Sequence, residues 1–510
     1  MTTLAGVRAL SNTPSDQLTH RQRLVIFSGL MFGMVLGALD TTIVATALPT
    51  MVGDLGGLDH ISWVVTAYLL TATITSPLYG KLGDLYGRRP LYQAAIAVFL
   101  VGSVLCGLAP GMGAMIAARA LQGCGAGGLV VLSQAIIADV VSPRERGRYQ
   151  GMFGAAFGAA TVVGPLAGGF LTDHLSWRWV FYVNLPIGAL ALLVTGLVLP
   201  RSLRRPNVRV DLAGAALLSV AIASVVLVTS WGGVEHAWGS PVIVGLGTLA
   251  VVTGAAFVVV ERRVPEPLLP LSLFRFRAFC LAGAVAVLLG VSMFGAINFL
   301  PLFVQVVNDV SATSSGVLLI PLMGGMVLTS VTTGNFVSRT GHYRAFPIAG
   351  TVVNVVGVVS VGLLGAASGR LASTVSLLLI GCAYGLTMQV MIVATQNEVP
   401  RSELGVATST INFFRSIGGA LGVALIGAMF TSRLVARVGD VARDGALDPG
   451  YVDTLAPAAR QEYVERFAEA LAGTFWYVVP LALAAVLCAL AVRERPLRES
   501  VRAEGAVALE

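Results

Sequence analysis

GKLGDLYGRRP, residues 80–90, returns in altered form as GNFVSRTGHYR, residues 334–344. Both segments carry glycine at their first and eighth positions, and both carry basic residues in their last three positions. A second pair of related segments, VSPRERGRYQG at 141–151 and VPRSELGVATS at 399–409, lies farther along each half. The chain therefore repeats one structural unit, and this repetition decides how its helices are grouped.

The composition is that of a membrane protein. The 510 residues are 56% hydrophobic and only 12% charged, with a mean hydropathy of +0.83, whereas soluble domains carry about 25% charged residues. Apolar runs long enough to span a bilayer recur along the chain. We expect an all-α polytopic membrane protein. No catalytic triad, HExxH motif, phosphate loop or metal-ligand cluster is present in the sequence, so we expect neither an enzyme nor a bound metal or cofactor.

The hydropathy pattern predicts fourteen membrane-spanning helices. Their expected bounds are 24–48, 61–80, 90–109, 112–140, 147–172, 179–199, 211–231, 241–261, 278–306, 313–337, 345–366, 373–397, 404–432 and 473–492. The repeated segments follow or precede helices 2, 5, 10 and 13, so both repeats are offset by eight helices rather than six. Two six-helix bundles with an extra helix pair between them explain this offset.

These helices divide the chain into consecutive parts. We expect a cytoplasmic tail at 1–23, a bundle at 24–203, an inserted helix pair at 204–264, a second bundle at 265–492 and a tail at 493–510. The second bundle includes a long outer loop, 433–470, in which ARQEYVERFAEAL could form a short surface helix.

Lys and Arg fix the expected orientation. They gather in every second short loop, whereas the short loops on the other side carry only Arg178 and Arg370. Because basic loops stay in the cytoplasm, we expect a protein of the cytoplasmic membrane with both termini cytoplasmic. The net charge of +7 then mostly reflects the basic residues of the cytoplasmic loops. We expect membrane lipids as partners and no nucleic acid. We expect the protein to function as a monomer.

Several motifs occur in order along these helices. They are LDTTIVATALP (39–49) in helix 1, GKLGDLYGRR (80–89) after helix 2, MIAARALQGCGAG (115–127) in helix 4, VVGPLAGG (162–169) in helix 5 and WRWVFYVNLPIG (177–188) at helix 6. In this order the chain resembles the major facilitator superfamily and, within it, the fourteen-span drug:proton antiporters. The resemblance implies the two-bundle major facilitator fold.

The resemblance also implies a function. We expect a proton-coupled antiporter that exports lipophilic drugs or antibiotics, with the proton gradient as its energy source. Helix 10 carries no acid, which disfavours dicationic substrates, so neutral or monocationic molecules are expected. A facilitator or importer of a small nutrient is the alternative, and a non-transporting membrane sensor is a third reading. The tails are too short for a signalling domain, and the helix 1 and helix 5 motifs disfavour an importer.

Asp40 is the central candidate residue. A charged Asp at a helix centre costs about 2.5–3.5 kcal/mol on insertion scales, so it requires a partner, a wet cavity or a proton. Asp40 lies roughly 15 Å from the outer end of helix 1, and Arg119 lies roughly 10 Å from the same side in helix 4. The two residues can therefore meet. We expect Asp40 to exchange protons in competition with substrate; a static ion pair with Arg119 is the alternative.

The loop and helix 5 motifs carry two further expectations. The resemblance implies a gating latch after helix 2, in which Asp84 meets a helix N-terminus or a basic residue of 144–148; positive-inside topology alone is the alternative. The expected latch residues are Gly80, Asp84, Gly87, Arg88, Arg89 and Arg146. Small residues and a proline in helix 5 would shape a gate, or would only permit close packing. They are Gly164, Pro165, Gly168 and Gly169.

The substrate cavity is expected between the two bundles. Aromatic and methionine side chains suit lipophilic or cationic ligands, and Arg415 in helix 13 faces no evident acid, so amides or backbone carbonyls are its candidate partners. The residues expected to border the cavity are Trp63, Tyr68, Phe153, Phe157, Tyr384, Met388, Gln389, Asn412 and Arg415.

Overall fold

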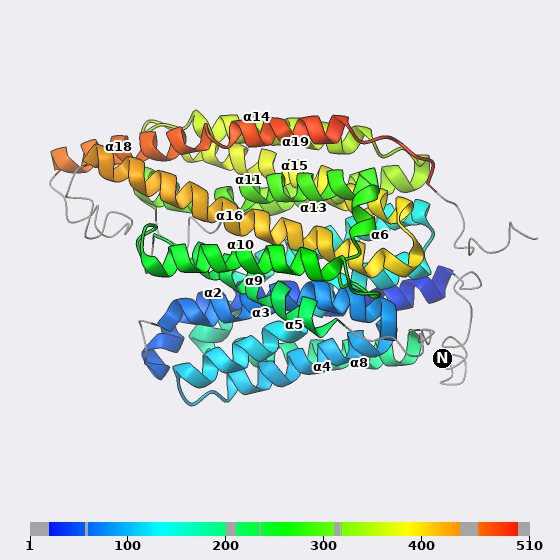
Figure 1. Cartoon of the computed structure of the whole chain (residues 1–510). Helices are drawn as coiled ribbons and strands as arrows, with labels where there is room; N and C mark the ends of the chain where they lie inside the picture. Colours follow the sequence, from blue (N-terminus) through cyan, green and yellow to red (C-terminus); the bar gives the residue numbers. More distant parts are fainter. Residues whose placement is uncertain are drawn as a thin grey trace, which may run out of the picture.

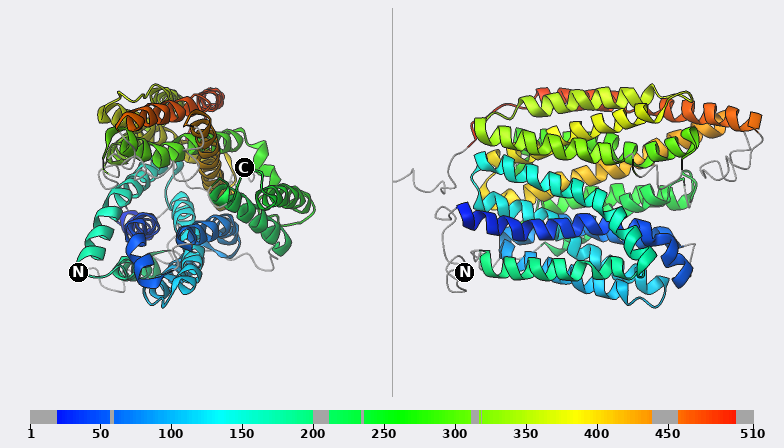
Figure 2. Two further views of the ribbon diagram at one scale, coloured as in Figure 1. Left: turned by 90° about the vertical axis from the view of Figure 1, so that its left-hand side faces the viewer. Right: turned by 180° about the vertical axis from the view of Figure 1, so that it is seen from behind.

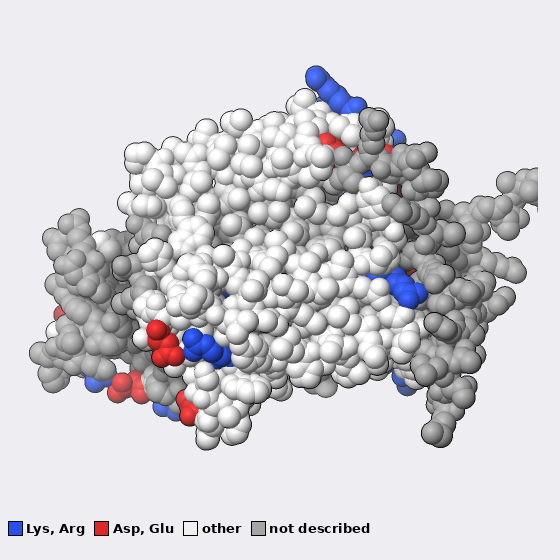
Figure 3. Space-filling model, turned by 90° about the horizontal axis from the view of Figure 1, so that it is seen from below, with Lys and Arg blue, Asp and Glu red and all other residues white. Residues whose placement is uncertain are grey.

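The computed structural model describes residues 20–56, 60–199, 211–233, 236–310, 317, 319–438 and 457–497. In this part of the chain, long helices run nearly parallel to one another, as Figure 1 shows. Figure 3 shows that charged side chains gather toward the two ends of the bundle and that a broad middle band of the visible face is uncharged. This distribution suits a bilayer, because apolar lipid tails favour an uncharged surface.

The first half of the chain forms one bundle, drawn in blue to cyan in Figure 1. Its helices are α2 (His20–Leu55), α3 (Ile61–Tyr86), α4 (Arg88–Gly107), α5 (Met112–Val140), α6 (Pro143–His174), α7 (Trp179–Tyr182) and α8 (Asn184–Val198). Ser142 is the N-cap of α6, because its side chain accepts a hydrogen bond from the Glu145 amide. The predicted sixth span is divided into α7 and α8 at Val183.

The second half forms the other bundle, which lies above the first in Figure 1. Its helices are α11 (Arg277–Asn308), α13 (Leu319–Thr340), α14 (Ala345–Gly362), α15 (Arg370–Glu398), α16 (Leu404–Val438), α18 (Pro457–Phe475) and α19 (Val479–Leu490), with short 3-10 turns η3 (Leu271–Arg275) and η4 (Arg401–Glu403). Between the bundles in sequence, α9 (Leu212–Trp231) and α10 (Pro241–Glu261) pair with each other. Figure 2 shows this pair at the flank of the molecule, where α9 contacts both α3 and α16.

Thirteen of the described helical segments are long and apolar enough to cross a membrane. The remaining predicted span, 61–80, corresponds to α3, a helix of 26 residues that includes Lys81 and Asp84 near its end. The total of fourteen spans thus stays a prediction. The all-helical membrane architecture is confirmed.

The long loop expected at 433–470 is partly helical. Helix α16 extends to Val438 and α18 begins at Pro457, while the residues between them lie outside the described part. Helix α18 projects beyond the other helices (Figure 1), but its apolar face is not free: Phe467 is buried and its ring lies 5.0 Å from that of Phe430. The expected surface helix is therefore packed against the end of α16.

The repeated segments pair crosswise between the bundles. The end of α3 lies so close to the start of α16 that a methyl group at Gly80 would overlap Ser409. The end of α13 lies in the same way against the start of α6, where Gly334 meets the backbone of Gly147. Each half therefore places the end of its second helix against the start of the other half's fifth helix. We call the end of the molecule where these contacts lie the basic end.

The aligned glycines at the eighth position have a conformational role. Gly87 and Gly341 have φ values of 96° and 78°, which side chains rarely permit. The chain turns there at the end of α3 and of α13. This shared backbone conformation explains why the repeat keeps glycine at that position.

Candidate functional site

Asp40 lies in the interior of the first bundle, where three side chains donate hydrogen bonds to its carboxylate. Arg119 Nη1 lies 2.6 Å from Oδ2, Gln122 Nε2 lies 2.7 Å from Oδ1, and Asn184 Nδ2 lies 3.0 Å from Oδ1. The carboxylate is 0% exposed. A buried charge is tolerated when it is paired and hydrogen-bonded, and here α5 and α8 supply the donors to a residue of α2.

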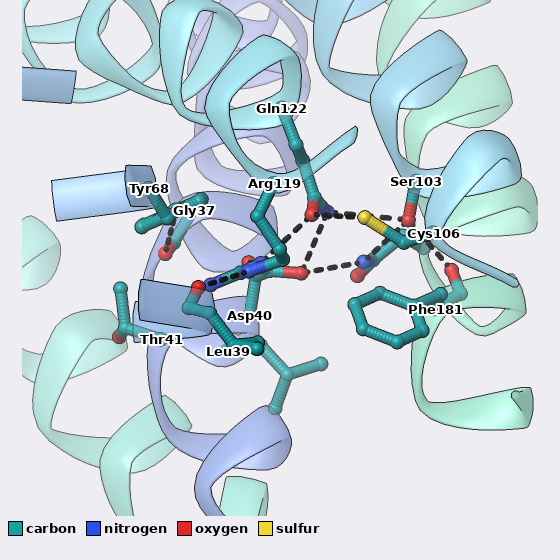
Figure 4. A network of polar contacts seen from close by, with 12 residues as sticks. Gly37, Leu39, Asp40, Thr41, Tyr68, Ser103, Cys106, Arg119, Gln122 and Phe181 are labelled. Atoms are coloured by element: carbon teal, nitrogen blue, oxygen red, sulfur yellow. Dashed lines mark hydrogen bonds and ion pairs between the residues drawn. The ribbon is translucent and has the colours of Figure 1, made fainter. Parts of the chain in front are cut away.

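Arg119 is held just as firmly. Its Nε donates to the Val64 carbonyl at 3.1 Å and its Nη1 to Gln122 Oε1 at 2.8 Å. The Tyr68 ring lies 4.1 Å from the guanidinium carbon, in a cation–π arrangement. Figure 4 shows these side chains converging from several helices. The depths estimated from sequence allowed Asp40 and Arg119 to meet, and the structure shows them in contact.

A second layer of polar groups orients the donors. Ser103 Oγ accepts from Asn184 Nδ2 at 3.0 Å and from Gln122 Nε2 at 3.3 Å, and it donates to the Phe181 carbonyl at 2.8 Å. Asn184 Oδ1, in contrast, is buried and has no hydrogen-bond partner among the described residues. The network therefore surrounds the Asp40 carboxylate with donors and leaves one acceptor, Asn184 Oδ1, without a described partner.

Sequence analysis missed Gln122, Ser103 and Asn184. A signal for Gln122 was present, because it lies three residues after Arg119 and so shares its helix face. Asn184 stands alone as an amide within an apolar stretch at the start of α8. Tyr68 was expected in the substrate cavity, but it packs against Arg119 instead because its helix turns that face toward α5.

The expected latch joins the two halves at the basic end. Asp84 Oδ1 accepts from the Gly405 amide at 3.2 Å and Oδ2 from the Val406 amide at 3.0 Å. These amides belong to the first turn of α16, where helix N–H groups lack intrahelical partners and the helix dipole favours an anion. Arg88 in turn lies 2.7 Å from Asp84 and 2.7 Å from Asp139. Of the two partners expected for Asp84, the structure has the helix N-terminus.

Two other expected latch residues, Arg146 and Arg89, bond different halves of the molecule. Arg146 Nη1 donates to the Gln396 carbonyl on α15 at 3.2 Å, so it crosses to the second half without touching Asp84. Arg89 donates to the Leu199 carbonyl at 2.8 Å, within its own half. The basic end is thus closed by contacts between the halves.

The helix 5 motif allows α6 to approach α2. A methyl group at Gly164 would overlap the Thr42 hydroxyl, and one at Gly168 would overlap the Thr46 hydroxyl. Gly169 has open space around its α-carbon, and Pro165 is exposed. Two of the four motif residues therefore serve the contact between α6 and α2.

A small cavity lies between the two bundles. Helices α2, α5 and α6 line it from the first half, and α13, α15 and α16 from the second. Its lining residues are Met34, Val130, Gln134, Gly154, Phe157, Met326, Ser330, Tyr384, Gln389 and Arg415. About 20 Å³ is open to the centres of water-sized molecules, which is room for about one water. A larger ligand requires the halves to move apart.

Four of the nine expected cavity residues line this space: Phe157, Tyr384, Gln389 and Arg415. Asn412 lies beside it, and its Nδ2 donates to Gln134 Oε1 across the interface at 2.8 Å. The rest lie elsewhere in this conformation, since packing turns their helix faces away. Trp63 contacts Trp231, Phe153 contacts Phe27, Met388 is in the core of the second half, and Tyr68 contacts Arg119.

Comparison with known proteins identifies the family of the chain. The sequence profile of the Major Facilitator Superfamily matches residues 30–423. The chain belongs to the Major Facilitator Superfamily. As a member of this superfamily it is a multi-pass membrane transporter of small molecules rather than an enzyme.

Two members of the superfamily are similar to this chain over most of its length. An uncharacterized MFS-type transporter of Mycobacterium tuberculosis is 39% identical over 97% of this chain and 74% of its own length. The multidrug transporter protein MdtP of Bacillus subtilis is 39% identical over 82% of this chain and 77% of its own length. Relatives of this kind place the chain among efflux transporters.

A solved structure supports the same fold. The human organic anion transporter MFSD10 has a TM-score of 0.64, with 16% identity over 92% of this chain and 99% of that one. At this identity the likeness concerns the fold alone. The two-bundle architecture predicted from the repeated segments is therefore the major facilitator fold.

Proposed function

We propose that the protein is a proton-coupled antiporter that exports lipophilic small molecules across the cytoplasmic membrane by alternating access. The expected substrates are neutral or monocationic drugs or antibiotics. The two multidrug transport and resistance proteins of Bacillus subtilis that are 36–39% identical to this chain support a drug as the substrate. The basic end faces the cytoplasm together with both termini, because basic loops stay inside. A single chain is the working unit.

The observation that carries this proposal is the hydrogen-bond network of Asp40. The Asp40 carboxylate accepts hydrogen bonds from Arg119, Gln122 and Asn184. A protonated carboxyl group has an O–H that needs an acceptor and loses most of its attraction to Arg119. The amide of Asn184, whose Oδ1 is unused, is placed to turn and accept that hydrogen. Protonation therefore alters the contacts that hold α2, α5 and α8 together.

This change couples the proton to the movement of the halves. Asp40 is fully buried and does not line the described cavity, so in this conformation substrate and proton do not contact the carboxylate together. Coupling proceeds instead through helices α2 and α5, which both line the cavity and hold the Asp40 network. Release of the Asp84 latch from α16 then opens the basic end.

Asp40→Asn tests the proposal, because asparagine keeps the size of the side chain but cannot exchange a proton. Everted membrane vesicles acidified inside are supplied with ethidium, Nile red or pyrenebutyrate, and probe uptake is followed by fluorescence. We expect uptake driven by the pH gradient in the wild type and its loss, by about 100-fold or more, in the variant. Expression and melting temperature are measured in parallel to show that the variant inserts and folds.

Asp54→Asn is the matched control. Asp54 lies on the same helix as Asp40, but toward the end of the molecule opposite the basic end. Its side chain is half exposed and lies 3.8 Å from that of Arg178. This variant should transport at the wild-type rate. Uptake by Asp40→Asn at the wild-type rate under the same gradient would overturn the proposal.

A further inference from the structure

We propose that the cavity between the halves selects lipophilic organic anions, whose acidic group binds Arg415. This inference rests on the proposed export function, but it replaces the neutral or monocationic substrates proposed above with lipophilic anions. It favours anions over the monocations that the sequence suggested. The carrying observation is an intramembrane cation at the interface of the halves that has no carboxylate partner among the described residues.

Arg415 lies deep in the membrane region. It follows the start of α16 at Leu404 by eleven residues, which corresponds to roughly 17 Å along the helix and hence to the middle of a bilayer about 30 Å thick. A charged group at this depth is costly and marks a substrate or ion pathway. Arg415 is also among the residues that line the cavity, so its charge faces the space between the halves.

The guanidinium of Arg415 makes few hydrogen bonds to the described part of the chain. Its hydrogen bond in the described part of the chain is from Nη1 to Tyr384 Oη, at 3.1 Å. Arginine has five N–H donors arranged in a planar fork that matches a carboxylate. The described lining of the cavity contains no Asp or Glu. Donors therefore remain for an anionic ligand, and no protein charge competes for them.

The remaining walls suit the other end of such a ligand. Met34, Phe157 and Met326 contribute apolar side chains to the lining, and Gln389 contributes an amide whose Oε1 has no partner among the described residues and whose N–H groups are further donors. A molecule with one acidic group and an apolar body matches this combination of lining residues. A lipophilic cation would instead meet the charge of Arg415 in a region of low dielectric, where repulsion between like charges is strong.

Three pyrene probes of similar size test this selectivity: pyrenebutyrate, its methyl ester and pyrenebutyl-trimethylammonium. Their affinities for the purified full-length protein in detergent are measured by fluorescence, without any proton gradient. We expect the carboxylate to bind about tenfold or more tightly than the cation, on the scale of one charge-assisted hydrogen bond. In Arg415→Gln we expect the ratio of carboxylate to ester affinity to fall by about tenfold.

Arg433→Gln is the matched control. Arg433 lies on the same helix and also donates to a tyrosine hydroxyl, that of Tyr477 at 3.0 Å, but it is not among the residues that line the cavity. Its removal should leave the ratio unchanged. Tyr384→Phe keeps the charge of Arg415 and removes the hydroxyl that orients it. This variant should lower the ratio of carboxylate to ester affinity by about threefold, and it tests the inference if Arg415→Gln does not fold.

Two results would overturn the inference: cation binding as tight as carboxylate binding, or a ratio in Arg415→Gln and Tyr384→Phe equal to that of the wild type. Because binding is measured without a gradient, this outcome is independent of the Asp40→Asn experiment. Selective anion binding together with gradient-independent transport would instead leave the anion site intact and overturn proton coupling.

Discussion

Arg119 and Arg415 are both arginines within the membrane, but their surroundings are opposite. Arg119 is 1% exposed, forms an ion pair with Asp40 at 2.6 Å and lies against the Tyr68 ring. Arg415 lies at the interface of the halves, where its hydrogen bond in the described part of the chain goes to the Tyr384 hydroxyl. The charge of Arg119 is neutralised by Asp40 inside the first bundle. The charge of Arg415 lies between the two bundles and has no acidic partner among the described residues.

The difference separates two tasks. A compensated pair changes its environment only when a proton neutralises the acid, so it can report protonation to the helices that hold it. An uncompensated cation attracts whatever anion enters the cavity, so it can select a ligand. The comparison therefore assigns energy coupling to the interior of the first half and recognition to the surface between the halves.

Removal of Arg119 should have the largest effect on stability. Arg119→Gln leaves Asp40 without its cation, and breaking one side of a buried pair costs about 3–5 kcal/mol. We expect a large drop in the melting temperature of the purified protein in detergent. The double variant Asp40→Asn with Arg119→Gln should recover much of that stability, because no unpaired charge remains. Equal melting temperatures for the single and double variants would contradict this account of the pair.

Removal of Asn184 should have an intermediate effect. Asn184→Leu deletes one of the three donors to Asp40, and a buried group that loses a hydrogen-bond partner costs about 1–3 kcal/mol. We expect a moderate drop in melting temperature and a partial loss of gradient-driven uptake. Thr195→Val is the control, since Thr195 is also buried on α8 but bonds only the Ala191 and Leu192 carbonyls among the described groups. Uptake equal in both variants would argue against a coupling role for Asn184.

Removal of Arg415 should have the smallest effect on stability. Arg415→Gln gives up one hydrogen bond and leaves no buried acid behind, so we expect a change of about 1 kcal/mol or less. The measurement is again the melting temperature, compared directly with that of Arg119→Gln. A loss as large as that of Arg119→Gln would show that Arg415 has a structural role and would remove the contrast between the two arginines.

Much of the fold could be predicted from the sequence. The repeated segments predicted two bundles with a helix pair between them, as the structure shows. The similar depths of Asp40 and Arg119 indicated that the two residues can meet, and the structure shows their ion pair. The hydrogen-bond partners Gln122, Ser103 and Asn184 could not be predicted in the same way. They come from three helices, and hydropathy does not define the rotation of a helix about its axis.

The sequence by itself determined which segments enter the membrane, how far along each helix a charged residue lies, and which loops carry the basic residues. It could do so because a helix in lipid must satisfy its own backbone groups and match the thickness of the bilayer. Only the tertiary structure decided which way each helix face turns. Close packing at small residues sets that rotation, and it brings Tyr68 against Arg119, Asp84 onto α16, and Arg415 into the space between the halves.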